Sequence, residues 1–341
     1  MEDSRKLQFD SYFDLVDRKL EGFTLDKPTK IIIDTDPGAD DAQAIILAIH
    51  LAKKMNVEIL GITAMAGNGT LEDVVLNAQL TLLAADAPEI PIYRGQRDYL
   101  HPYEYEHPHY GMDGFGEYSQ EMKDIASNLV NVQDQLAVEF LSQTAAKYPG
   151  EVTLICLAPL TNIAVVLKQD PSFGKNIKNI VLLGGSYLAH GNTKYNCSEF
   201  NFLKDPEAAS IVFELCDHIT MVPIEVSRSF RRLPQAYVSQ AFTAETKKGQ
   251  LVNKSFQIAY RNSGNYYEVV DPCAIAVAFC PEVVTEHYQK PCFIETEGRY
   301  TRGMVVIDWI GRSIEKRHNT NIIASIDLHK VVDMLIECVQ E

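Results

Sequence analysis

Positive charge and paired cysteines are scarce in this sequence, and each shortage excludes a class of protein. Of the 341 residues, 46 are acidic and 31 basic, a net charge of −15 that argues against a surface built to follow nucleic-acid phosphates. The seven cysteines form no Cys-x-x-Cys pair, so we expect reduced thiols in a cytoplasmic protein rather than disulfides or a zinc site. No apolar run reaches transmembrane length, and the first residues lack the order of a secretory signal.

The most informative stretch is residues 31–41, which read Ile-Ile-Ile-Asp-Thr-Asp-Pro-Gly-Ala-Asp-Asp. Its three isoleucines predict a short strand that is buried on both faces, as in a parallel sheet. Four carboxylates follow, at Asp34, Asp36, Asp40 and Asp41. The chain turns at Pro37-Gly38 and becomes helix-forming from Asp40, so the acids lie where a strand ends and a helix begins. Open α/β sheets bind their ligands at that edge.

Four neighbouring carboxylates need a reason, because ionised acids repel one another and burial increases the cost. A bound hard cation, calcium or magnesium, removes the difficulty. The alternative is that Asp40 and Asp41 only cap the following helix and complement its dipole. Capping does not account for Asp34 and Asp36, so we favour a metal site.

Strand and helix patterns alternate along most of the chain. Strands are predicted at residues 57–66, 91–94, 152–157, 180–183, 219–226 and 304–308, and helices at 72–86, 133–148 and 330–338, with two more opening near Pro159 and at Pro206. Such alternation predicts βαβ units and one large α/β domain on a mainly parallel, Rossmann-like sheet. We place this domain at residues 30–341, behind an amphipathic helical extension at residues 1–29.

Polar residues recur after the predicted strands. Asn68, between two glycines, is either a turn former or a ligand at the same sheet edge. The loop before Pro206 carries Asn192, Glu199 and Asn201, which match the hydrogen-bonding needs of sugar hydroxyls, although an ordinary Asx-rich loop has the same composition. Asp271, before a proline, is either a helix cap or a further acid of the site.

Residues 96–120 break the alternation with a long loop rich in tyrosine, histidine and glycine, which is typical of a segment that covers a site. His107 and His109 lack the partnering ligands of a zinc site. Asp113-Gly114 lacks the acidic ladder of an EF-hand.

Together these segments resemble the nucleoside hydrolase family, the inosine-uridine-preferring ribohydrolases. The resemblance runs from about residue 30 to the C-terminus and rests on motifs in family order. They are Asp34-Thr-Asp-Pro-Gly-Ala-Asp-Asp, Gly67-Asn68, Ala158-Pro-Leu-Thr-Asn-Ile-Ala, Gly191-Asn192 with Glu199-Phe-Asn201, and Asp271-Pro-Cys-Ala. It implies hydrolysis of a nucleoside to ribose and free base by a homodimer or homotetramer, with no nucleic-acid or membrane partner.

The resemblance also implies roles for individual residues. Calcium would be held by Asp36, Asp41, Asp271 and the carbonyl of Leu157, with Asp36 as the general base that deprotonates a water and Asp34 in support. The residues implied to bind the nucleoside are Asp40, Asn68, Leu183, Asn192, Glu199 and Asn201. Asn196 is an alternative to Asn192, because this loop is slightly longer than in some relatives. Acids around the sugar would also stabilise its oxocarbenium-like transition state.

One departure bears on the base. Members that cleave both inosine and uridine have a histidine before the last Asp-Pro, where it protonates the departing base, but this chain has Val270. We therefore expect a preference for purines, which leave after protonation of the ring with help from aromatic contacts. The single tryptophan, Trp309, is assigned to packing. Candidate residues for contact with the base are His109, which is also the candidate acid, and Tyr110, Tyr260, Tyr266 and Tyr267.

Two other functions start from similar features. Haloacid dehalogenase-like phosphatases also end their first strand in Asp-x-Asp, but they need Thr or Val soon after the second acid, where this chain has Pro37-Gly38. A non-catalytic, calcium-dependent nucleoside-binding protein would explain the missing histidine, but the intact Asp36 argues against it.

Overall fold

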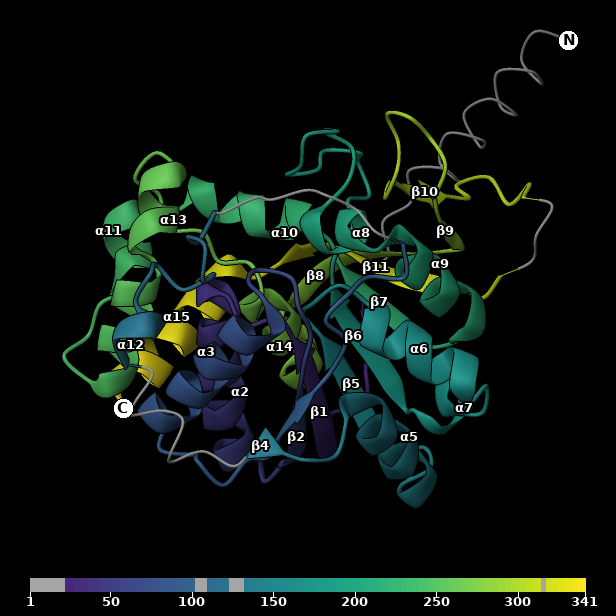
Figure 1. The fold of residues 1–341 in the computed structure, drawn as a ribbon. Coiled ribbons are helices and arrows are strands. Elements are labelled where there is room, and N and C mark those ends of the chain that lie inside the picture. Colours follow the sequence, from purple (N-terminus) through teal and green to yellow (C-terminus); the bar gives the residue numbers. More distant parts are fainter. Residues whose placement is uncertain (1–21, 102–108, 123–131, 314–316) are drawn as a thin grey trace, which may run out of the picture.

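The computed structural model describes residues 22–101, 109–122, 132–313 and 317–341 (Figure 1). The helix expected within residues 1–29 therefore falls mostly outside the described residues, as do Tyr103, Tyr105 and His107. None of the helices in the described ranges is long and apolar enough to cross a membrane.

A mainly parallel sheet forms the centre of the molecule, as predicted. Its strands lie in the order β4-β3-β2-β1-β5-β6-β7-β11-β8, and only β8 runs antiparallel to its neighbour. The strands are β1 (Lys30–Thr35), β2 (Glu58–Ala64), β3 (Ile92–Arg94), β4 (Val132–Gln133), β5 (Val152–Cys156), β6 (Asn179–Leu183), β7 (Ile219–Val222), β8 (Val284–Lys290) and β11 (Thr320–Ile326). A separate pair, β9 (Cys292–Ile294) and β10 (Val305–Ile307), contains the strand expected at 304–308.

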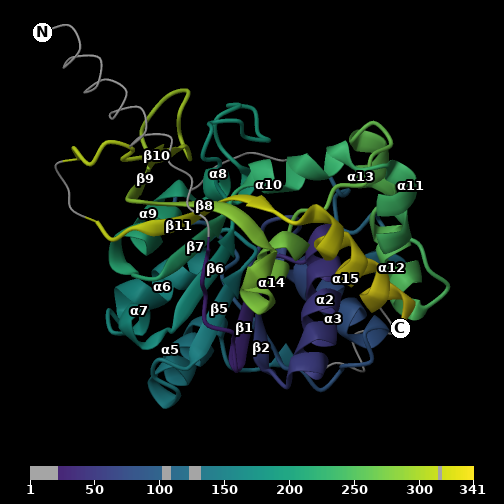
Figure 2. The same ribbon diagram turned by 180° about the vertical axis from the view of Figure 1, so that it is seen from behind.

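Helices cover both faces of the sheet (Figures 1 and 2). One layer comprises α2 (Ala39–Met55), α3 (Leu71–Ala84), α14 (Pro272–Phe279) and α15 (Leu328–Gln340). The other comprises α5 (Ala137–Lys147), α6 (Thr161–Gln169), α7 (Phe173–Asn176) and α9 (Pro206–Leu215). Short helices follow the carboxyl ends of β6 and β7 and continue toward α14: α8 (Phe200–Lys204), α10 (Ile224–Arg228), α11 (Gln235–Val238), α12 (Lys247–Ser255) and α13 (Gln257–Asn262).

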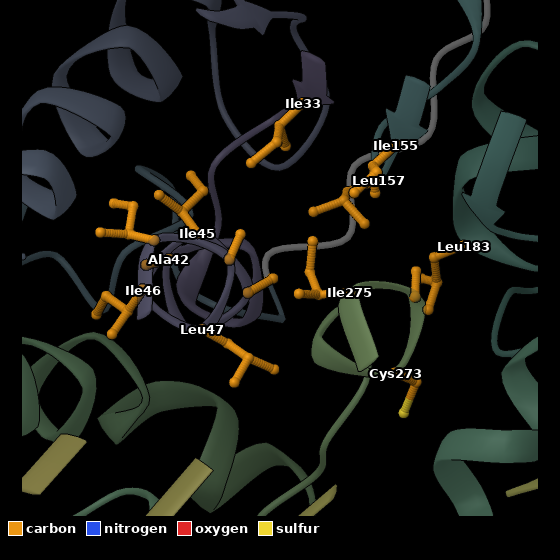
Figure 3. Close-up of a cluster of buried hydrophobic side chains, with 14 of the residues drawn as sticks. Ile33, Ala42, Ile45, Ile46, Leu47, Ile155, Leu157, Leu183, Cys273 and Ile275 are labelled. Atoms are coloured by element: carbon orange, nitrogen blue, oxygen red, sulfur yellow. The ribbon is translucent and has the colours of Figure 1, made fainter. Parts of the chain in front are cut away.

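Burial on both faces explains the sequence of the central strand. Ile31, Ile32 and Ile33 are all fully buried, with alternate side chains in the two hydrophobic layers. Figure 3 shows Ile33 and Ile155 from the strands gathered with side chains of α2 and α14. Burying a side chain of this size is worth roughly 1.5–3 kcal/mol, so the strand that carries the acids is anchored on both sides.

The topology places a crevice at the end of β1. This strand pairs with β2 on one side and β5 on the other, while α2 and α6 pack on opposite faces. The connections that leave β1 and β5 therefore run to opposite faces of the sheet, and open α/β sheets bind ligands in the crevice between such connections.

Two predicted elements differ in the structure. The strand predicted at 219–226 ends at Val222, because Pro223 has no N–H for the sheet and Ile224 opens helix α10. The helix predicted from Gln133 begins at Ala137, because Val132 and Gln133 pair with β3 at the sheet edge. Hydrophobic periodicity detects neither the early end of the first strand nor the edge pairing of the second segment.

Candidate active site

Four carboxylates converge at the carboxyl end of β1. Asp36 follows the strand, Asp40 and Asp41 lie in the first turn of α2, and Asp271 precedes α14. All four are buried, with between 0% and 5% of their surface exposed. Oxygen atoms of Asp40, Asp41 and Asp271 lie within 4.8 Å of one another. The structure thus joins acids that are more than 200 residues apart in the sequence.

Backbone and amide groups hold these acids in place. Both the backbone N–H of Gly38 and the side-chain amide of Asn68 donate to Asp41 Oδ2, at 2.9 and 3.1 Å. The backbone N–H of Asn68 donates to Asp36 Oδ2 at 2.7 Å. Asn68 therefore reaches the acid cluster, and the glycine next to it permits the approach, since a Cβ on Gly67 would lie 2.0 Å from Asp36 Oδ2.

The electrostatics of the cluster are unfavourable for the protein alone. Burial raises the pKa of Asp36 well above its usual value, and the charge of Asp41 raises it further. Burial and Asp41 raise the pKa of Asp40 to about 8. The pKa of Asp271 is also raised well above normal, first by burial and then by the other acids. Keeping these groups ionised at neutral pH requires a compensating positive charge.

The donor set fits a hard divalent cation. The grouped side chains offer only carboxylate oxygens, the ligands that calcium and magnesium prefer. Asp36 Oδ1 is buried and has no hydrogen-bond partner among the described residues. A buried carboxylate oxygen without a donor is costly unless a cation satisfies it.

Asp34 has a different environment from the other acids. Its Oδ1 accepts hydrogen bonds from Thr63 Oγ1 at 2.6 Å and from the amide of Asn162 at 2.8 Å. Burial raises its pKa to about 7 against these two donors. Asp34 therefore links β1 to β2 and α6 beneath the cluster, and its supporting role remains a prediction.

Asn201 fixes two carbonyl groups at neighbouring strand ends. Its amide donates to the carbonyl oxygen of Leu157 at 2.8 Å and to that of Leu183 at 3.3 Å. Glu199 lies two residues earlier and is 2% exposed. Its carboxylate accepts from the backbone N–H groups of Asn201 and Gly185 at 2.9 and 3.0 Å, while burial raises its pKa to about 7.

A cavity of about 260 Å³ opens above the acids. Its lining includes most of the predicted substrate residues, namely Asp40, Asn68, His109, Tyr110, Leu183, Asn192, Glu199 and Asn201, together with Leu157, Val270 and Asp271. Asn192 lies on the wall and Asn196 does not, so the geometry favours Asn192 of these two alternatives.

Three predicted aromatic contacts are not part of this cavity lining. Tyr267 packs against Phe242 and Tyr260, with ring centroids 4.4 and 4.5 Å apart, and Tyr266 is 42% exposed. Tyr267 packs against the hydrophobic layer and Tyr260 packs against Tyr267, contacts that local sequence does not reveal. Trp309 contacts Tyr288 edge-on, as expected for a packing residue.

The structure adds cavity residues that sequence reasoning missed. These are Phe200, Ile224, Ser227, Arg228, Arg231, Asn262, Ser263 and Glu268. Of these residues, only Glu268 could have been suggested by its position in the sequence, because it lies three residues before the predicted site residue Asp271. Arg228 and Arg231 follow the misassigned strand end, where the sequence pattern pointed to a sheet.

An α/β sheet with a cavity at its carboxyl edge has the ligand-binding arrangement of open α/β folds, and the oxygen-rich acid cluster beside it fits a metal ion. The profile of the inosine-uridine preferring nucleoside hydrolases matches residues 31–333. The chain belongs to this family, and it is an enzyme that hydrolyses N-glycosidic bonds of nucleosides.

Individual relatives are similar along most of their length. Uridine nucleosidase 1 of Arabidopsis thaliana is 33% identical over 286 residues, which cover 81% of each chain. The inosine-uridine preferring nucleoside hydrolase of Leishmania major is 31% identical over 328 residues, 92% of this chain and 98% of its own. The solved purine-preferring ribonucleoside hydrolase from Gardnerella vaginalis superposes with a TM-score of 0.76 at 27% identity, covering 91% of this chain and 98% of that one.

Gly67→Ala tests the close packing behind Asp36. The added Cβ would lie 2.0 Å from Asp36 Oδ2 and displace the carboxylate. We expect turnover to fall on the order of 10²-fold, as for a catalytic group moved by about 1 Å. Gly69→Ala is the matched control, because its Cβ would meet Asp73 Cβ at 3.0 Å and no acid of the cluster. The measurement is the steady-state turnover rate of each variant. Similar losses in the two variants would contradict a specific role for Gly67.

Proposed function

We propose that this enzyme is a calcium-dependent ribonucleoside hydrolase that prefers purine nucleosides. The observation that carries the proposal is the buried, oxygen-only cluster of Asp40, Asp41 and Asp271, beside Asp36 and beneath a cavity of nucleoside size. Calcium is favoured because it takes several carboxylate and carbonyl oxygens in flexible geometry.

The residues of the site divide the work of hydrolysis. Asp36, Asp41, Asp271 and the Leu157 carbonyl would hold the cation, which when bound orients a water and the ribose hydroxyls and eases deprotonation of that water. Asp36 accepts the proton as the water attacks the anomeric carbon of ribose. The buried acids also stabilise the positive charge that develops on the sugar.

The polar wall of the cavity would bind the ribose. Asp40 and Asn68 lie next to the proposed cation ligands and are assigned to the secondary hydroxyls. Asn192, Glu199 and Asn201 line the same cavity and are assigned to the remaining hydroxyl groups, including the 5′-hydroxyl. Asn201 also braces the Leu157 carbonyl, so one amide connects the ribose subsite with the cation subsite.

The proposal extends to the organisation of the protein. The catalytic domain would span residues 30–341, with residues 1–29 as an N-terminal extension, in a homodimer or homotetramer. All seven cysteines are free thiols, which supports a cytoplasmic location.

Release of ribose from inosine is the direct test of function. We expect the purified protein to produce reducing sugar in the presence of calcium, to lose activity in a chelator, and to regain it when calcium is restored. Asp36→Asn should abolish turnover while retaining part of the nucleoside affinity, because an amide cannot accept the proton. A near-normal rate in this variant would assign the base elsewhere. Release of phosphate from phosphate esters without cleavage of nucleosides would support a phosphatase instead.

The preference for purines is argued from the cavity, since the relatives carry the names of uridine, inosine-uridine and purine enzymes. Val270 lines the cavity where a proton donor would otherwise stand. An apolar side chain cannot protonate a departing uracil, whereas a purine offers an imidazole-ring nitrogen to another acid. A general acid is typically worth ~10²-fold or more.

We therefore expect inosine or guanosine to exceed uridine in kcat/KM by at least ~10-fold, a cautious share of the general-acid factor. The measurement is a nucleoside panel scored for reducing sugar under one set of conditions. Equal values for inosine and uridine would refute the preference.

A further inference from the structure

His109 and Glu268 face each other in the wall of the cavity. His109 belongs to the loop before η1 (Ser119–Met122), and Glu268 lies three residues before Asp271. His109 Nε2 and Glu268 Oε2 are 3.9 Å apart, and the two side chains are 23% and 25% exposed. The pair is therefore partly shielded from water yet open to a ligand in the cavity.

Neighbouring groups fix both members of the pair. Arg231 bonds to Oε1 of Glu268, the oxygen on the other side of the carboxylate from His109. Asn262 donates its amide N–H to the backbone carbonyl of His109 at 2.9 Å. The ring of Tyr110 meets the imidazole edge-on, with centroids 4.8 Å apart and planes at 82°. Such bracing is characteristic of a side chain whose orientation matters.

Charged side chains surround His109 in the cavity wall. Glu268 is the facing carboxylate, whereas the charge of Asp40 and Asp271 in the same cavity is compensated by the cation that those acids require. Arg228 and Arg231 also line the cavity, but Arg228 is directed to the carbonyls of His190 and Gly191, and Arg231 to Glu268. A carboxylate beside an imidazole both orients the ring and stabilises the imidazolium.

We propose that His109 is the general acid that protonates the departing base, and that Glu268 is its positioning residue. This inference rests on the proposed function and names the acid that the absence of histidine at position 270 leaves open. Glu268 lies two residues before Val270, so this segment still contributes a carboxylate to the cavity although it lacks the histidine.

The proton and electron balance of the step is simple. The bond between the anomeric carbon and the purine nitrogen breaks, and its electron pair passes to the base. The imidazolium of His109 gives a proton to a ring nitrogen of that base. Water adds its hydroxyl group to the anomeric carbon and its proton to Asp36. The products are neutral base and ribose, and proton exchange with solvent restores both side chains.

The test compares a leaving group that needs protonation with one that does not. Inosine and 4-nitrophenyl β-D-ribofuranoside share the ribose, but nitrophenolate departs as a stable anion. We expect His109→Ala to lower kcat for inosine by ~10²-fold or more. Glu268→Gln, which keeps the shape but removes the charge, should lower it by a smaller factor of about 10. Cleavage of the nitrophenyl riboside should change by less than about threefold in both variants, because it needs no acid.

Glu72→Gln is the control, since Glu72 pairs with Arg97 at the exposed surface, where both side chains are 62% exposed. It should leave both substrates unaffected. Equal losses on inosine and the nitrophenyl riboside, or no loss on inosine, would overturn the assignment of His109 and Glu268. Failure of the wild-type protein to cleave either riboside would instead reject the proposed function, so the two failures are distinguishable.

Discussion

The mutual repulsion of buried carboxylates at the end of β1 is the constraint on which the site depends. Asp36, Asp40, Asp41 and Asp271 lie together in a buried crevice. Burial is the largest cause that raises the pKa of Asp36, Asp40 and Asp271, and the charge of neighbouring acids is the next. The surrounding groups hold these acids in position without neutralising them. A bound cation would make the ionised arrangement favourable, and such a cation would also provide a place for water and ribose hydroxyls.

Much of the fold and of the cation site is predictable from the sequence, because both depend on local patterns. Three consecutive isoleucines require burial on two faces, which a parallel sheet provides. The acids of α2 follow within a single turn, so their proximity to Asp36 needs no tertiary information. The position of Asp271 beside them came from family resemblance rather than from local chemistry, because more than 200 residues separate it from the others.

The cavity wall around His109 and Glu268 was not predictable in the same way. Tyr260 and Tyr267 are candidate base contacts in the sequence, but Tyr267 packs against Phe242 and Tyr260 packs against Tyr267. Arg231 and Glu268 became visible as a pair only in the structure, since 37 residues separate them. Residues from a loop, from the segment after β7 and from the entry to α14 meet there, and no local pattern sets such a meeting.

Thermal unfolding with and without calcium tests the central claim most directly. At a calcium concentration of 100 times Kd, binding stabilises the folded state by about 2.7 kcal/mol, so Tm of the wild-type protein should rise by a few degrees over its value in chelator. Asp271→Asn should lose most of this rise and should be no less stable than the wild type in chelator, because one repelling charge is gone. A calcium effect that is absent from the wild type, or equal in the variant, would contradict the account.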